Sequence, residues 1–501
     1  MKLYALYLPQ FHRIPENDVW WGEGFTDWDT ARNAQKMFPE HNQPHMPFNG
    51  YEYNLLDKDA MKWQAETMQR YGIDGVFIYH YWFENGRRVL EKPAENLLKW
   101  TDIDMPFCFC WANERWMRTW DRFADGNVWC SVNQKNSVRG NVLLEQKYGA
   151  WDDWKTHFEY LLPFFKDCRY VHIEGRPAVC IYKPSDILCF EDMKECWDRL
   201  SDEHNIPHVY FICGYQSDEA AEKYDMCLYH SPRIAQENMK VDRRNGVRVL
   251  DYEMASKYII ARKATVATCS FSGFVGYDDT PRHQLRGTVY INRTPEKFRK
   301  QLTELMAKNE KLGAPFTVIN AWNEWGEGMH LEPDEKDGYK YLEQIQKAKE
   351  EYPDILDSID SMEEKYREEL SECILPKQKR SKDSIYLNLL DLWLVLKEDN
   401  KSLEKFFYTR GYEKICIYGM GVLGEHLYEE LRGSVIEILY VVDRDRDRQY
   451  PIQHFTPDEE LPDADAMIVT AVLSFANIRD VYKDSFHGRI ISIEEVLHES
   501  R

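Results

Sequence analysis

The sequence predicts an α/β protein in which a (β/α)8 TIM-like barrel is followed by a helical linker and a small Rossmann-like domain. Eight apolar, strand-like runs alternate with helix-like runs through residues 1–350, as in a parallel sheet whose strands are joined by helices. A charged stretch, 351–410, precedes residues 411–501, where a strand leads into a GxGxxG turn and a helix. That order of elements is typical of a Rossmann-like sheet.

The runs that we expect to be barrel strands are short and apolar. They span residues 2–8, 74–80, 106–111, 176–182, 208–213, 226–229, 265–274 and 315–321. Residues 59–71, 151–165, 188–203 and 296–309 read as helices between them. In such barrels the functional side chains lie at the carboxyl ends of the strands.

Polar and aromatic residues gather directly after these runs. The predicted substrate-binding residues are Gln10, His12, Trp20, Tyr79, His80, Tyr81, Trp111, Asn113, Glu114, Asp279, Arg282, Trp322 and Asn323. Tyr182, Lys183, Tyr215 and Asp278 gather there as well. The histidines could instead be structural, and Asp279 and Arg282 could equally belong to a capped turn.

Two carboxylates, Glu324 and Glu327, follow the last run and are set among two Trp, an Asn and two Gly. If the turn there leads into a helix, positions i and i+3 lie roughly 5–6 Å apart. That is close to the separation of about 5–5.5 Å expected of a retaining carboxylate pair at a glycosidic bond. The alternative is a capped helix start with two solvated glutamates. Glu114 lies in a similar Asn-Glu corner, where it could join the pair or be a salt-bridged loop residue.

Composition excludes several classes of function. The formal net charge of −21, from 64 Lys and Arg against 85 Asp and Glu, argues against a nucleic-acid or anionic-membrane partner. No apolar run reaches the roughly 18 residues that span a bilayer, and the N-terminal segment, with its run 2–8, reads as a first strand rather than a signal peptide. The 12 cysteines form no CxxC pair, so we expect reduced thiols in a cytoplasmic protein. No HxH or HExxH spacing supports a metal.

The C-terminal glycine turn is the one candidate for a cofactor. Gly419, Gly421 and Gly424 follow the strand 414–418, and Asp443 ends the next strand. This arrangement can bind a nucleotide, but residues 411–501 provide only half of a doubly wound sheet, so the turn could serve the fold alone. We expect no cofactor for the barrel.

Four motifs together carry a resemblance to a known family. They are Tyr7–His12 (YLPQFH), Trp20–Trp28 (WWGEGFTDW), Trp111–Glu114 (WANE) and Trp322–Gly328 (WNEWGEG). Over about residues 1–345 the chain resembles the WbsX-type proteins of bacterial O-antigen and capsule loci. These in turn resemble glycoside hydrolase family 99, the endo-α-mannosidases, which are (β/α)8 barrels.

The resemblance implies roles for the two glutamates. Glu324 would be the base that deprotonates the sugar 2-hydroxyl, forming a 1,2-anhydro intermediate. Glu327 would protonate the leaving oxygen and later activate water. The sequence departs from the family pattern at Asp27, where Glu is more frequent, and at Gly326, where Ala is frequent.

We therefore predict a cytoplasmic, metal-independent enzyme that acts on glycosidic bonds of bacterial surface polysaccharide or related α-linked oligosaccharides. The alternatives are a glycosyltransferase of O-antigen or capsule (lipopolysaccharide) biosynthesis that uses a sugar nucleotide, and a non-catalytic glycan-binding protein. The expected partner is an oligosaccharide or polysaccharide, with peripheral contact to a lipid-linked glycan as an option.

Overall fold

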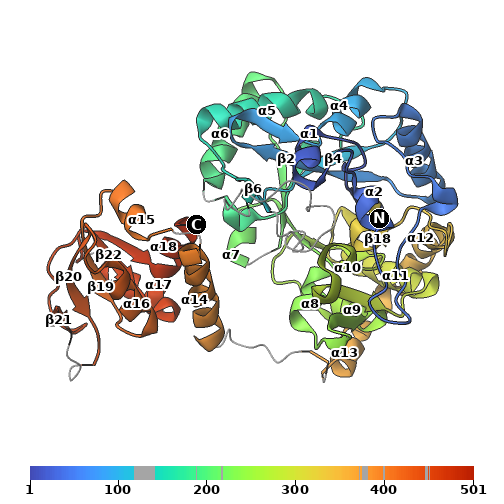
Figure 1. Ribbon diagram of the computed structural model, residues 1–501. Coiled ribbons are helices and arrows are strands. Elements are labelled where there is room, and N and C mark those ends of the chain that lie inside the picture. The colour runs from blue at the N-terminus through green and yellow to red at the C-terminus, as the bar shows by residue number, and fades with distance from the viewer. Residues whose placement is uncertain are drawn as a thin grey trace. The chain divides into compact units, whose positions relative to one another are not determined.

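The computed structural model describes residues 1–117, 142–187, 189–215, 218–371, 373–374, 382–398, 401–445, 450, 452–483 and 485–500. The chain divides into two compact units, 1–375 and 376–501, and each is described by itself (Figure 1). Among the helices of these residues, none is both long and apolar enough to cross a membrane.

A closed ring of parallel strands forms the centre of the first unit. Its members are β1 (Lys2–Tyr7), β2 (Gly75–Phe83), β4 (Phe107–Trp111), β8 (Arg176–Ile181), β9 (Tyr210–Gly214), β10 (Met226–Tyr229), β13 (Cys269–Phe271) with β14 (Gly273–Phe274), and β16 (Phe316–Asn320). Every neighbouring pair in the ring is parallel. β13 and β14 belong to one extended segment that pairs with β10 at one end and with β16 at the other. The segment closes the sheet, so the predicted (β/α)8 barrel is confirmed.

Helices fill the connections between these strands, and α3 to α6 flank the outer side of the sheet (Figure 1). The helices are α3 (Lys58–Tyr71), α4 (Lys92–Lys99), α5 (Trp151–Phe165), α6 (Phe190–Glu203), α7 (Asp218–Ala221), α9 (Tyr252–Ala261), α11 (Pro295–Lys311), α12 (Lys340–Glu351) and α13 (Ile359–Glu369). Local signals set their ends: Asp57 caps α3, and Gly72 ends it in the left-handed conformation, which glycine adopts without steric cost.

Short elements decorate the carboxyl ends of the barrel strands. They are α1 (Pro15–Trp21), α2 (Asp27–Arg32), β3 (Arg87–Val89), β5 (Trp116–Met117), β6 (Val142–Leu144), α8 (Arg233–Asn238), β11 (Asp242–Arg244), β12 (Val247–Asp251), α10 (Thr280–His283), β15 (Thr288–Ile291), β17 (Asn323–Glu324) and β18 (Met329–His330). At the opposite end of the barrel, β7 (His172–Ile173) pairs with the start of β8. β11, β12 and β15 form a small sheet of their own.

The second unit contains a parallel sheet in the order β21-β20-β19-β22-β23. The strands are β19 (Lys414–Tyr418), β20 (Glu437–Val442), β21 (Gln453–Phe455), β22 (Ala466–Val469) and β23 (Arg489–Ser492). In chain order this is 3-2-1-4-5, the order of a Rossmann sheet. Its helices are α14 (Lys382–Glu398), α15 (Glu404–Thr409), α16 (Val422–Leu431), α17 (Phe475–Tyr482) and α18 (Ile493–Glu499).

The helices of the expected linker divide between the two units. Ile359 and Tyr366 of α13 are buried in a core cluster of the barrel unit. Leu389 and Trp393 of α14 are buried in the core of the C-terminal unit. Each helix therefore has an apolar face that one unit covers, which a free linker would leave exposed.

Candidate active site

Glu324 and Glu327 lie on a hairpin turn after β16. Glu324 ends β17, which pairs antiparallel with β18, and Trp325–Glu327 form a single 3-10 turn. Gly328 then reverses the chain in the left-handed conformation, with φ +59°. The turn therefore does not lead into an α-helix, as the spacing argument had assumed, because the chain folds back to pair with itself.

Asparagine clamps hold the two Asn-Glu corners. The Asn323 side chain accepts a hydrogen bond from Leu8 N at 2.8 Å and donates one to Leu8 O at 3.0 Å. Asn113 does the same with Lys183, at 2.7 Å in both directions. Each amide thus ties its corner to the end of a neighbouring strand. These bonds engage both polar ends of each amide, so the two asparagines are placed to orient the glutamates. Their predicted contact with substrate stays a prediction.

One guanidinium lies among three carboxylates at this turn. Arg282 Nη2 lies 3.3 Å from Asp27 Oδ1 and 3.8 Å from Glu324 Oε2, and Arg282 Nε lies 3.7 Å from Glu327 Oε1. Asp27 also accepts a hydrogen bond from Gly326 N at 3.3 Å. The side chain of Asp27 is fully buried and that of Glu324 is 8% exposed, whereas that of Glu327 is 30% exposed. Glu327 is therefore the most accessible acid of the group.

Burial and charge alter the acidity of both glutamates. Burial raises the pKa of Glu324 well above its usual range, and Glu327 adds to this while Arg282 opposes it. Burial also raises the pKa of Glu327, against the effect of Arg282 and His283. One guanidinium cannot neutralise three carboxylates, so the pair retains a proton at a pH where an exposed glutamate would be ionised. Such a pair is suited to general acid–base work.

Arg282 is held in place by the segment that carries it. The Asp279 carboxylate accepts hydrogen bonds from Thr288 N at 2.5 Å and from the Tyr277 hydroxyl at 3.0 Å, and contacts His283 Nδ1 at 3.0 Å. These bonds fix the start and end of α10. The capped-turn interpretation fits Asp278, whose carboxylate accepts a hydrogen bond from Thr280 N at 3.1 Å, and not Asp279, which makes no side-chain bond to the start of the helix. Arg282 is the residue of this segment that reaches the glutamates.

A wall of aromatic rings lies beside the glutamates. Burial raises the pKa of Tyr79 and of Tyr81, and for both the nearby Glu324 is the next cause. The Tyr81 ring contacts Trp116 at 5.1 Å between centroids, and Trp116 contacts Trp20 at 5.4 Å. Aromatic faces of this kind stack on the apolar faces of a sugar while hydroxyls reach its polar edge.

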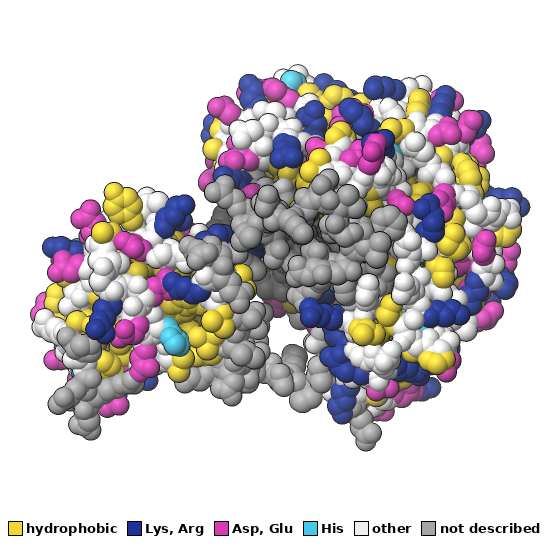
Figure 2. Space-filling view, in the orientation of Figure 1, with side chains coloured by type: hydrophobic (Ala, Val, Ile, Leu, Met, Phe, Trp, Pro, Cys, Tyr) yellow, Lys and Arg dark blue, Asp and Glu magenta, His cyan; other side chains and the backbone are white. Residues whose placement is uncertain are grey.

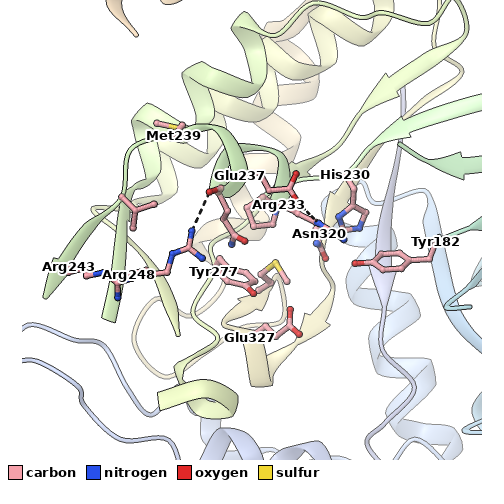
Figure 3. A pocket seen from close by; sticks show the side chains of 14 residues that line it. Tyr182, His230, Arg233, Glu237, Met239, Arg243, Arg248, Tyr277, Asn320 and Glu327 are labelled. Atoms are coloured by element: carbon pink, nitrogen blue, oxygen red, sulfur yellow. Dashed lines mark hydrogen bonds and ion pairs between the residues drawn. The ribbon is translucent and has the colours of Figure 1, made fainter. Parts of the chain in front are cut away.

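A cavity of about 770 Å³ opens next to Glu327, a volume within the usual range of small-molecule sites. It is lined by Tyr182, His230, Pro232, Arg233, Gln236, Glu237, Met239, Val241, Arg243, Arg248, Tyr277, Asn320, Glu327 and Met329. In Figure 3 Tyr182 points its hydroxyl into this space from one side, and Glu327 enters from the turn after β16.

Several predicted site residues face away from the glutamates. Alternate residues of a strand point to opposite faces, so His80 packs toward α5, where its Nε2 lies 2.9 Å from His157 Nε2. Burial lowers the pKa of His80 to about 3. Trp111 donates its indole N–H to Trp82 O at 3.2 Å in the same layer, and Trp322 is fully buried in the core. The prediction that these three contact substrate is corrected accordingly.

Glu114 and Gln10, two of the three remaining predicted residues, have structural partners. Glu114 forms an ion pair with Lys183, as its salt-bridged interpretation predicted, although the partner is not the neighbouring Arg115. The Gln10 carbonyl accepts a hydrogen bond from Asp27 N at 3.2 Å and so helps to place that carboxylate. His12 is buried, and neither of its ring nitrogens has a hydrogen-bond partner among the described residues. Burial lowers its pKa to about 4, and its contact with substrate stays a prediction.

A comparison with protein-family models shows which family the chain matches. The model described as Glycosyltransferase WbsX matches residues 3–345. The chain belongs to the WbsX glycosyltransferase family. The resemblance predicted from the four motifs is thus confirmed, over nearly the same residues.

Two curated relatives of this WbsX-family chain are both described as uncharacterized protein WxcX, from two strains of Xanthomonas campestris pv. campestris. Each is 29% identical over 462 residues, which cover 88% of this chain and 62% of the relative. The chain therefore spans less than two thirds of the length of these relatives.

Among solved structures, the WbsX-family chain matches the GH99 endo-α-mannosidase from Bacteroides thetaiotaomicron. The match has 14% identity, a TM-score of 0.43, and covers 71% of this chain and 98% of that one. A structure titled glycoside hydrolase-like protein matches with 12% identity and a TM-score of 0.38, covering 69% of this chain and 93% of the other.

Sequence reasoning missed part of the WbsX-family site. Asp27 was noted only as a departure from the family pattern, although its place in Trp20–Trp28 could have marked it. His230 directly follows β10, so the strand-end rule could have found it. Arg233, Arg243 and Arg248 lie on short elements between β10 and β13, and nothing in the local sequence points them toward Glu327.

A buried trio beneath the turn offers metal-ligating atoms. His45, His330 and Asp334 lie within reach of one ion. Hydrogen bonds already account for the two rings: Asn42 Nδ2 lies 2.9 Å from His45 Nε2, His45 Nδ1 lies 3.0 Å from His330 Nε2, and His330 Nδ1 lies 3.0 Å from Glu332 O. One tautomer of each ring satisfies the whole chain of bonds, so the trio is stable as a neutral network.

In the glycine turn of the C-terminal unit, the backbone and Asp443 contact one another closely. A Cβ on Gly424 would lie 2.1 Å from Gly419 O, whereas one on Gly421 would meet nothing within 4 Å. Asp443 accepts a hydrogen bond from Met420 N at 2.6 Å, so the acid that would meet a ribose binds the turn itself. A nucleotide at Gly419, Gly421, Gly424 and Asp443 stays a prediction.

Proposed function

We propose that the barrel of this WbsX-family protein breaks or rearranges glycosidic bonds at the Glu324–Glu327 pair. The observation that carries the proposal is the placement of Glu327. It lines a cavity of sugar-binding size and shares Arg282 with the more buried Glu324. A carboxyl group at a cavity wall, with a second carboxyl group behind it, is the arrangement that glycosidic-bond chemistry requires.

The two glutamates divide the work according to their exposure. Glu327 reaches the cavity, so it donates its proton to the glycosidic oxygen as the bond from that oxygen to the anomeric carbon breaks. Glu324 takes the proton of the 2-hydroxyl, whose oxygen closes onto the anomeric carbon to give a 1,2-anhydro sugar. The Glu327 carboxylate then removes a proton from water, and the water oxygen bonds to the anomeric carbon. The bond from that carbon to the 2-oxygen breaks, and Glu324 returns its proton to the 2-oxygen. This sequence follows the roles that the resemblance implied and needs no metal.

A second candidate is sugar transfer, in which an acceptor hydroxyl takes the place of water. The family description names a glycosyltransferase, and the cavity beside Glu327 is lined by three arginines. In both cases we propose a cytoplasmic enzyme whose substrate is a bacterial surface polysaccharide, an α-linked oligosaccharide or a lipid-linked precursor.

Mass spectrometry of reaction products tests these proposals. The full chain is incubated with α-linked oligosaccharides, and separately with sugar nucleotides and acceptors, alongside Glu327→Gln and Glu324→Gln. Glu335→Gln is the matched control, because Glu335 lies nearby on an exposed position. Loss of a general acid or base costs roughly 10²- to 10⁴-fold in rate, so products should form only with wild type and the control. Equal activity of Glu327→Gln would refute the site, and acceptor-dependent transfer without hydrolysis would select the second candidate.

A further inference from the structure

Three arginines line the cavity beside Glu327. Arg233 comes from α8, Arg243 from β11 and Arg248 from β12. Figure 3 shows Arg243 and Arg248 on the side of the cavity away from Tyr182. In the space-filling view, Lys and Arg side chains gather over the part of the barrel unit that carries α8 and α9 (Figure 2). This concentration of positive charge occurs in a chain with a formal net charge of −21.

The charge of these arginines is only partly compensated. Arg233 uses Nε to bind Glu237 at 2.8 Å, and its Nη nitrogens have no hydrogen-bond partner among the described residues. Arg243 donates to Gly246 O at 2.8 Å and Arg248 to Gln236 O at 3.4 Å. Within the described part of the chain, neither of these two has a carboxylate within ion-pair distance. Arg282 differs, because acids surround it.

Two polar atoms of the cavity wall also lack partners. His230 Nε2 and Asn320 Oδ1 are buried without a hydrogen bond among the described residues, and both residues line the cavity. Burial lowers the pKa of His230 to about 4, so the ring is neutral near pH 7. A neutral donor or acceptor suits a hydroxyl, whereas a guanidinium suits a phosphate, which it can bind through two parallel hydrogen bonds.

We infer that the cavity binds a sugar carrying a diphosphate, with the sugar near Glu327, His230 and Asn320 and the diphosphate against Arg233, Arg243 and Arg248. Three guanidinium groups match a diphosphate better than a single carboxylate, because the non-bridging oxygens of two phosphates offer more hydrogen-bond acceptors than one carboxylate does. The diphosphate could belong to a nucleotide or to a lipid carrier. The inference deepens the proposed function, on which it rests for the reaction, and it places the activated sugar in the barrel rather than at the C-terminal glycine turn.

Binding of inorganic pyrophosphate to the full-length chain tests the inference by calorimetry. Arg248→Ala and Arg243→Ala are compared with Arg244→Ala. Arg244 is the matched control because it lies on β11 beside Arg243, while its guanidinium lies over the Phe38 ring. Loss of a charge-assisted phosphate contact weakens binding by roughly 10- to 100-fold, so we expect that loss in the first two variants and little change in the control. Binding should also weaken as salt rises.

Further ligands identify the source of the diphosphate. Uridine diphosphate binding more tightly than pyrophosphate supports a nucleotide-linked sugar, and geranyl diphosphate binding more tightly supports a lipid-linked one. Absence of saturable pyrophosphate binding overturns the inference, as does tighter binding of glucuronate or equal binding by Arg248→Ala, which would place the anion elsewhere. Pyrophosphate binding by wild type and Glu327→Gln in the absence of any activity would sink the proposed function and leave this inference standing.

Discussion

Replacing Arg282 by Met tests whether one guanidinium sets the acidity of the candidate catalytic pair. Methionine keeps the length and apolar stem of the side chain but removes the charge. In the wild type the guanidinium lies 3.3–3.8 Å from the carboxylates of Asp27, Glu324 and Glu327. The variant keeps these three carboxylates together but has no cation among them. We therefore expect the pKa of both glutamates to rise further.

The distance gives the size of the effect. A charge pair at 3.7 Å with an effective dielectric constant of about 20 is worth about 4 kcal/mol, or about 3 pKa units. Breaking a buried ion pair by removing one partner costs about 3–5 kcal/mol of stability. Because the folded-state pKa values of the glutamates are raised, the stability they contribute is present below about pH 4.5 and is lost as pH rises through those values. The difference between wild type and variant should therefore grow from pH 4 to pH 8.

Urea unfolding followed by tryptophan fluorescence measures this difference. Of the 16 tryptophans, Trp393 is the one that lies beyond residue 375, so the signal reports mainly on the barrel unit. Arg286→Met is the matched control, because Arg286 is exposed and lies on the same segment. A loss of stability that is the same at low and high pH would refute the electrostatic reasoning. So would an equal loss in the control.

Three further predictions concern residues that support the site and the C-terminal sheet. Asn323→Ala removes the side-chain hydrogen bonds to the buried N–H and C=O of Leu8, so the free energy of unfolding should fall by roughly 2–4 kcal/mol. A loss below about 1 kcal/mol in the urea assay would contradict this role of Asn323. Burial raises the pKa of Glu332 to about 7, so the free energy of unfolding should fall by about 3 kcal/mol between about pH 5 and pH 8. Glu332→Gln should reduce this dependence of stability on pH. An unchanged dependence would show that another group titrates in this range. A Cβ at position 424 would collide with the Gly419 carbonyl oxygen, whereas a Cβ at position 421 meets nothing. Gly424→Ala should therefore lower the calorimetric melting temperature of the C-terminal unit, and Gly421→Ala should not. Equal melting temperatures of the two variants would show that position 424 does not require glycine.

The barrel strands could be predicted because buried parallel strands have a recognisable sequence pattern. Parallel strands covered on both faces read as continuous apolar runs, and all eight predicted runs fall on observed strands. The hairpin β11–β12 and the helices α8 and α10 were not predicted. Their residues include several charged side chains, as in Asp242–Arg244, and such segments have no apolar period to mark them.

The glutamate pair could be found from one local motif, but its surroundings could not. The sequence marks Glu324 and Glu327 by their spacing and their aromatic neighbours. It does not show that Asp27, far away in the chain, lies 3.3 Å from Arg282. Nor does strand-end position say which way a side chain points: Tyr79 and His80 are neighbours, yet one lies near Glu324 and the other packs against α5.

By itself, therefore, the sequence determined where the strands lie, which loop carries the paired acids and which family the chain resembles. Those properties depend on local period and on residues close together in the chain. Only the tertiary structure decided which side chains face the cavity, that Arg282 lies among three carboxylates, and that three arginines line the same cavity as Glu327. Acidity and recognition depend on distances between segments that the chain brings together when it folds, because charges interact through space and burial removes the water that would screen them.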